Sequence, residues 1–262
     1  MTRQHDLEYP LRNPSCSSFE ITDQYFPWLS KNIVVLCFDW FEAFLCYSFD
    51  GNSIGKLSNT IIGDSNFGHN GGGLIKYKRS LLTVGGWGNR KTEILERNSN
   101  GAYIWSTVEP DFDFTEWNFH SWKHIQSHSL VNIKSSNINE EYVLLSGGSY
   151  GGYDDDGPPP KIMERIYKFN GTWHPFGQLR RPRTHHSSIY WNGAVYFIGG
   201  YYSFRTVDGN WRTVDENSRV RMEIWKIPDI PDRFETTENW PELFNWDSPH
   251  LFIVQDSFFP DH

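Results

Sequence analysis

Short apolar segments alternate with turn residues along most of the chain, and three of them end in a pair of glycines. The three lie at 81–86, 142–148 and 194–200, and a fourth, 33–38, ends in Cys37-Phe38 instead. Apolar runs of this length, rich in β-branched and aromatic residues and bounded by turn signals, are typical of β-strands. The pattern therefore predicts an all-β chain of many short strands.

A second strand-like segment follows each of these four, so the elements repeat. In two copies it leads into Asp50-Gly51 or Asn170-Gly171, dipeptides that accept the positive φ angles of a tight hairpin turn. Another strand, with the turn Asn192-Gly193, precedes the last glycine pair. The predicted unit is strand, turn, strand ending in Gly-Gly, variable loop, strand, turn and strand, and it recurs about every 50 residues.

This unit resembles the kelch repeat. The resemblance rests on the three glycine pairs and on Trp105, Tyr167 and Trp173, and it covers about residues 33–257. It implies a kelch-like β-propeller of four-stranded antiparallel blades. The glycine pairs would let backbones approach closely, and the repeated aromatic residues would fill the space between the sheets.

Four blades are expected from the count of these apolar strands, three with a glycine pair and 33–38 without one, with five as the alternative if residues 17–32 hold further strands or an N-terminal portion is missing. In kelch propellers the C-terminal strand often completes the first blade. By that resemblance, residues 250–256 are expected to pair with the 33–38 strand. Residues 1–16 are polar and are predicted to form a poorly ordered arm, with residues 17–262 as a single propeller domain.

Composition agrees with strands rather than helices, because aromatic residues make up 17% of the chain and charged residues only 21%. The formal net charge of -8 disfavours nucleic-acid binding. No apolar run approaches the length of a membrane helix, so no membrane insertion is expected. The polar N-terminus has no signal-peptide pattern, which favours a cytoplasmic location; a secreted location is the alternative if a leader is missing.

The three cysteines, Cys16, Cys37 and Cys46, form neither a disulfide framework nor a zinc motif. Buried thiols are the favoured interpretation. The alternative is a cross-strand bond between Cys37 and Cys46, which would lie opposite each other if the turn is centred between Phe41 and Glu42. Such a bond would indicate an oxidising compartment.

The loops that follow the glycine pairs differ greatly in length although the frame repeats, which is typical of a scaffold that presents a binding site. Alternate connections of an antiparallel blade share one end, so these loops and the segments between blades are expected on one face. Tyrosine, tryptophan and arginine are enriched at interaction hot spots. The loops 149–163 and 201–222 therefore predict a protein-interaction face, with the candidate anchors Tyr153, Tyr202, Arg205, Trp211 and Arg180.

Two alternatives stay open for these loops. The 201–222 segment is equally consistent with an extended hairpin that buries its own aromatic residues. A different class of function, an extracellular carbohydrate-binding or matrix domain, is the alternative to a protein-interaction module. The acidic run Asp154–Asp156 lacks the ligand spacing of a calcium loop, so no metal is expected.

Motifs of catalysis and cofactor binding are not found in the sequence: there is no nucleophile elbow, phosphate loop or dinucleotide fingerprint. No cofactor and no enzymatic activity are therefore expected. Glu93, Glu164 and Glu223 recur at the same place in the repeat, which indicates structural hydrogen bonding, and Arg183 is assigned a structural role as well. Asn170-Gly171-Thr172 is the one usable N-glycosylation sequon, although the hairpin turn explains it equally well.

Overall fold

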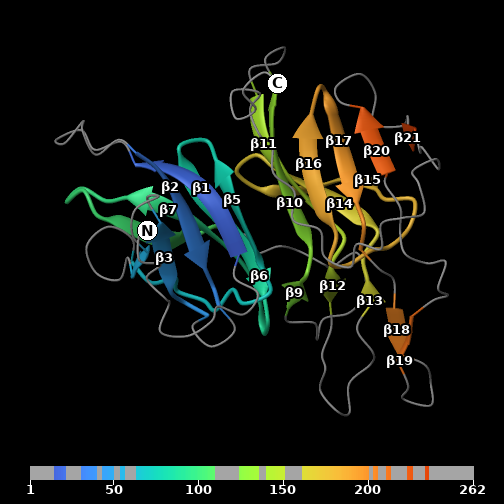
Figure 1. Cartoon of the computed structure of the whole chain (residues 1–262), viewed down its shortest axis with the longest axis horizontal. Coiled ribbons are helices and arrows are strands. Elements are labelled where there is room, and N and C mark those ends of the chain that lie inside the picture. The colour runs from blue at the N-terminus through green and yellow to red at the C-terminus, as the bar shows by residue number, and fades with distance from the viewer. Residues whose placement is uncertain are drawn as a thin grey trace, which may run out of the picture.

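The computed structural model describes residues 15–21, 31–39, 43–49, 54–56, 63–109, 124–135, 140–150, 161–200, 203–205, 211–213, 223–226 and 234–235. Within these ranges every regular element is a β-strand, and the strands form several antiparallel sheets (Figure 1). The predicted all-β class is thereby confirmed.

The first sheet is a meander of four strands in the order of the sequence. They are β1 (Ser15–Ile21), β2 (Lys31–Cys37), β3 (Cys46–Phe49) and β4 (Ile54–Lys56). The sequence did not reveal β1, whose first two residues belong to the segment assigned to the polar arm.

The pairing of β2 corrects one prediction. A strand has two edges, and β1 and β3 occupy both edges of β2. The expectation that residues 250–256 pair with the 33–38 strand is therefore wrong, although residues 250–256 themselves lie outside the described residues. Instead, Ser15–Ile21, on the N-terminal side of β2, pairs antiparallel with Lys31–Cys37 along all seven residues.

The second sheet begins with four strands in order: β5 (Gly73–Tyr77), β6 (Ser80–Gly86), β7 (Asn89–Arg97) and β8 (Tyr103–Thr107). It is then extended at the Gly86 end of β6 to seven strands by β9 (Ile125–Gln126), β12 (Ser149–Tyr150) and β13 (Lys161–Ile162). These three short strands belong to later parts of the chain, and the sequence pattern gave no sign of them.

Two more four-stranded sheets follow. The third contains β10 (Ser129–Ser135), β11 (Glu140–Ser146), β14 (Arg165–Phe169) and β15 (Trp173–Gln178). The fourth contains β16 (Ser187–Trp191), β17 (Ala194–Ile198), β20 (Glu223–Lys226) and β21 (Phe234–Glu235). The hairpin turns predicted at Asn170-Gly171 and Asn192-Gly193 lie between β14 and β15 and between β16 and β17. A separate hairpin joins β18 (Ser203–Arg205) and β19 (Trp211–Thr213).

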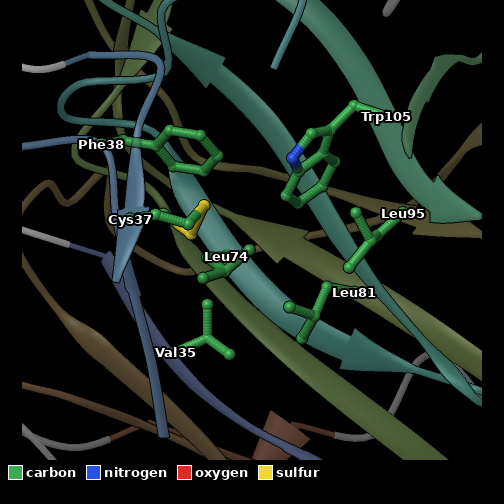
Figure 2. Packing of buried hydrophobic residues seen from close by; sticks show 8 residues of the cluster. Val35, Cys37, Phe38, Leu74, Leu81, Leu95 and Trp105 are labelled. Carbon is green, nitrogen blue, oxygen red and sulfur yellow. A yellow bond between two sulfur atoms is a disulfide. The ribbon is translucent and has the colours of Figure 1, made fainter. Parts of the chain in front are cut away.

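The first strands of successive sheets are neighbours: β1 contacts β5, β5 contacts β10, and β10 contacts β16. The apolar core therefore lies between successive sheets. Val35, Leu74 and Trp105 fill the space between the first and second sheets (Figure 2). Tyr77 and Phe169 join the second and third. Burial of each large apolar side chain contributes about 1.5–3 kcal/mol.

A disulfide joins Cys37 to Cys46 across β2 and β3 (Figure 2). The two residues are directly opposed, in a ladder that begins at Val34 and Phe49. The register is the one that the sequence allowed for a turn between Phe41 and Glu42, so the cross-strand alternative is correct and the favoured free thiols at these two positions are not. Cys16 is a free cysteine, as predicted, but it is exposed and not buried.

Candidate functional site

The glycine pairs that end β6, β11 and β17 define one end of the sheets, here called the doublet end. The first glycine of each pair has a similar positive φ angle: 66° at Gly85, 57° at Gly147 and 70° at Gly199. At Gly147 a Cβ atom would lie 2.3 Å from the carbonyl oxygen of Arg183. The expected role of the pairs, close approach of backbones, is confirmed at this position.

A histidine of the following sheet packs onto the first glycine of two pairs. His128, just before β10, lies against Gly85, and His186, just before β16, lies against Gly147. His186 also shares a hydrogen bond of 2.9 Å between its Nε2 and the Ser146 hydroxyl. Both imidazoles are buried. Each histidine therefore packs its own sheet against the glycine pair of the preceding sheet.

Burial also makes these imidazoles hard to protonate, because a charged ring would lose its hydration. Burial, together with the charge of His69, lowers the pKa of His128 to about 3. Burial and then the charges of Arg183, His128 and His185 lower the pKa of His186 well below its ordinary value. Both rings are neutral at neutral pH.

In two of the pairs, another buried side chain bonds to the backbone carbonyl oxygen of the first glycine. The His69 Nδ1 lies 2.5 Å from the Gly85 carbonyl oxygen, and the Arg183 guanidinium donates to the Gly199 carbonyl oxygen at 3.3 Å. In the registers of β5 with β6 and of β16 with β17, His69 and Arg183 stand at equivalent positions, four residues before the first strand. The structural role predicted for Arg183 is confirmed, because it is buried and bonds to backbone oxygens.

Glu93 completes this arrangement from β7. Its carboxylate accepts hydrogen bonds from the His69 Nε2 at 2.8 Å, the Asn66 side chain at 2.6 Å and the Phe67 backbone N–H at 3.2 Å. Burial alone would raise the pKa of Glu93, but the hydrogen bond and charge of His69 and the bonds from Asn66 outweigh it and lower the pKa. The structural role predicted for Glu93 is confirmed. Glu164 accepts a bond from Gln178 at 2.5 Å, and the side chain of Glu223 lies outside the described residues.

Two exposed aromatic residues lie at the doublet end, outside these buried groups. Trp87, directly after Gly86, is 42% exposed. Its ring stacks on that of His124, with centroids 5.6 Å apart and an interplanar angle of 16°. Phe44, in the loop after β2, is 47% exposed. Loop length drew attention to the longer loops, so this shorter one was missed; the tryptophan directly after the glycine pair was the available signal.

The two long loops chosen from the sequence meet at this end. β13, from the 149–163 loop, contacts β18, from the 201–222 loop, and in Figure 1 both lie at the same end of the sheets as β9 and β12. The expectation that the two loops share one face is met in these described segments. Within the 201–222 loop, β18 and β19 pair antiparallel, as in the extended hairpin that was the alternative for this segment; whether it buries its aromatic residues stays a prediction.

The five candidate anchors are placed to different extents. Arg205 on β18 and Trp211 on β19 are paired across this hairpin, and their side chains lie outside the described residues. Arg180 is exposed between β15 and β16. Tyr153 and Tyr202 lie outside the described residues. The structure therefore brings the backbones of Arg205 and Trp211 together at the doublet end.

Among the residues that the structure describes, no group of three or more histidine, cysteine, aspartate or glutamate side chains is arranged to hold a metal ion. No helix in this part of the chain is long and apolar enough to span a membrane.

Comparison with known proteins gives a distant structural likeness to a solved structure. No family model matches the chain, and no curated protein matches it. A solved structure described as "Structure of YjhT" is similar over 70% of this chain and 52% of that chain, with 18% sequence identity and a TM-score of 0.44. The similar region thus spans about half the length of that protein.

Proposed function

We propose that the chain is a non-catalytic protein-interaction module, built as a kelch-like propeller, whose doublet end recognises another protein. Four successive groups of four antiparallel strands support the architecture, as does the row of neighbouring first strands β1, β5, β10 and β16. Four such groups among the described residues favour the four-blade form over the five-blade alternative. Closure of the ring is part of the proposal.

The contact between β13 and β18 carries the functional proposal. It brings two long loops with different sequences onto one end of a repeating frame. Loops held by a rigid scaffold are the usual place for binding residues. The predicted anchors Tyr153, Tyr202, Arg205 and Trp211 belong to these two loops, and Arg180 is exposed at the same end of the third sheet.

The buried polar groups of this end support binding rather than acid–base chemistry. His69, Glu93 and Arg183 bond to one another or to backbone oxygens, and His128 and His186 pack against glycines. Each of these side chains is buried. Among the described residues of this end, Phe44, Trp87 and Arg180 are exposed instead.

The test compares tryptophan and arginine variants at the doublet end with a matched variant at the other end. Trp191 is 59% exposed beside the Asn192-Gly193 turn, so Trp191→Ala is the control for loss of an exposed tryptophan. Proteins retained from native extract by the immobilised chain are identified, and the affinity of each is then measured with purified components. Trp211→Ala or Arg205→Ala should weaken the affinity about thirtyfold.

The control and the melting temperatures separate the outcomes. Trp191→Ala should leave the affinity unchanged, and the doublet-end variants should melt within a few degrees of the natural chain. If Trp211→Ala unfolds the protein, Trp211 belongs to the core of the hairpin and Arg205→Ala and Arg180→Ala decide the proposal. Equal affinity in all of these variants would contradict it.

Carbohydrate binding is the second candidate, and the stacked Trp87–His124 pair favours it. An exposed flat ring of this kind can pack against the apolar face of a sugar. A glycan array probed with the natural chain and with Trp87→Ala tests this candidate. Glycan binding that Trp87→Ala removes and Trp191→Ala retains would support it over protein recognition.

A further inference from the structure

The turn between β14 and β15 consists of an N-glycosylation sequon. Asn170-Gly171-Thr172 is the only Asn-X-Ser/Thr sequence in the chain in which X is not proline. The ladder of β14 and β15 closes at Phe169 and Trp173, so the three sequon residues form the whole connection. All three are exposed.

The turn has room for a large substituent. A Cβ atom added to Gly171, whose φ is 123°, would meet no other atom within 4 Å. The Asn170 backbone N–H donates to the Thr172 carbonyl oxygen at 3.3 Å, and the Thr172 hydroxyl lies 2.8 Å from the His174 Nε2. These contacts leave the Asn170 side-chain amide outside the hydrogen bonds that hold the turn.

The disulfide is an independent observation that points to the same cellular environment. Cys37 and Cys46 are joined across β2 and β3, in a different sheet from the sequon. Structural disulfides form and persist in oxidising compartments such as the endoplasmic reticulum lumen. Transfer of N-linked glycans also takes place there, so one location accounts for both features.

The sequon lies at the opposite end of its sheet from the doublet end. β14 pairs with β11 from Ile166 opposite Ser146 to Phe169 opposite Val143. Ser146 is next to Gly147, so the strand leads away from the glycine pair toward the turn. A glycan on Asn170 would leave the proposed binding surface uncovered.

We propose that Asn170 is N-glycosylated, and that the chain matures in the secretory pathway rather than the cytoplasm. The donor would be an oligosaccharide carried on a lipid pyrophosphate. The Asn170 amide nitrogen forms a bond to the anomeric carbon of the sugar, and the bond from that carbon to the pyrophosphate oxygen breaks. The amide loses one proton to a base and the lipid pyrophosphate leaves, with no change in oxidation state. This inference is independent of the proposed binding function.

The first experiment examines the protein from its native source. The chain is recovered with an antibody and treated with peptide-N-glycosidase, and peptides are then analysed by mass spectrometry. The expected result is a gain in gel mobility and conversion of Asn170 to aspartate in most molecules. Unmodified Asn170 in the native protein would overturn the proposal.

A second experiment assigns the site in a secretory host, with a cleavable leader placed before the full chain. Asn170→Gln and Thr172→Ala should lose the glycan completely, whereas Thr172→Ser should keep it. Because transfer precedes folding, glycan occupancy is read on cell-associated as well as secreted protein, so a variant that is retained is still informative. A glycan that persists in Asn170→Gln would overturn the assignment.

Discussion

The ring of Phe38 lies against that of His69, with centroids 5.0 Å apart, at a place where the other sheets have glycine. Phe38 has a φ of 63°, close to the 66° of Gly85, and each directly follows the last residue that pairs with the first strand of its sheet, Cys37 opposite Ser15 and Val84 opposite Gly73. Phe38 is fully buried and also contacts Trp105 (Figure 2). The first sheet thus keeps the backbone turn of the doublet end but fills the space with an aromatic side chain.

At position 38 a glycine variant should be more stable than an alanine variant, the reverse of their usual order of stability. Loss of a buried phenylalanine costs about 3–5 kcal/mol of the free energy of unfolding. Phe38→Ala also keeps a side chain at positive φ, whereas Phe38→Gly removes that strain, worth roughly 1 kcal/mol. Phe38→Gly should therefore be the more stable of the two in urea unfolding. A more stable alanine variant would contradict the role assigned to the φ angle.

Gly147→Ala should be far more destabilising than Gly88→Ala. Both glycines have positive φ, 57° and 78°, so both variants bear the same kind of backbone strain, about 1–2 kcal/mol. Only at Gly147 would the new methyl meet other atoms, the Arg183 carbonyl oxygen and the His186 ring. We expect urea unfolding to show that Gly147→Ala loses about 2 kcal/mol or more of the free energy of unfolding beyond the loss in Gly88→Ala. Equal losses would mean that close approach of the backbones is unimportant there.

Stability should fall as the pH is lowered from about 6.5 toward about 3. The pKa of His128 lies near 3 in the folded chain against 6.5 ordinarily, so the unfolded state binds more protons within this window. The free energy of unfolding then drops by up to about 1.4 kcal/mol per pH unit for this one group. His186 acts in the same direction. So does Glu93, because its lowered pKa means that its stabilising charge is lost in acid.

The slope of stability against pH in a His128 variant tests whether His128 causes this effect. In urea unfolding at several pH values, His128→Gln should show a shallower fall between pH 6 and pH 4 than the natural chain, whatever its absolute stability. An unchanged slope would show that His128 is protonated in the folded protein.

Loss of the disulfide should weaken the fold without changing its architecture. The bond closes a short loop, and the entropy of that closure is worth about 2–3 kcal/mol. The double variant Cys37→Ala with Cys46→Ala should lose about this much in urea unfolding while it keeps its β-sheet circular dichroism. Denaturing thiol titration without reductant should label Cys16 alone, and labelling of all three cysteines would rule the bond out.

The sequence predicted the parts of the fold that repeat. The glycine-pair strands at 81–86, 142–148 and 194–200 appear as β6, β11 and β17, because each has a mostly apolar run with glycines at its end. The register of Cys37 with Cys46 followed from one assumed turn. β1 was missed because Ser15–Ile21 is mostly polar and has no such run.

The candidate site was less visible because its order depends on contacts between sheets. A search for glycine pairs passes over Phe38, which has the backbone angle of a glycine but a different side chain. The recurrence of Glu93 indicated a structural role, but its partner His69 is 24 residues away and no local pattern links the two. The strands β9, β12 and β13 have two residues each, too few to show a period.

These three short strands couple the local unfolding of the second sheet to that of the third. Two-residue strands at a sheet edge usually fray, and their amides exchange with solvent early. Here β9 pairs with β6 and with β12. Because β12 lies in the loop that connects β11 to β14 of the third sheet, the second sheet holds part of that loop. Separation of the two sheets must break this ladder as well as the apolar core between them. Amides at residues 125–126 and 149–150 should therefore exchange with the cooperative unit formed by both sheets, although they lie in what would otherwise be loops.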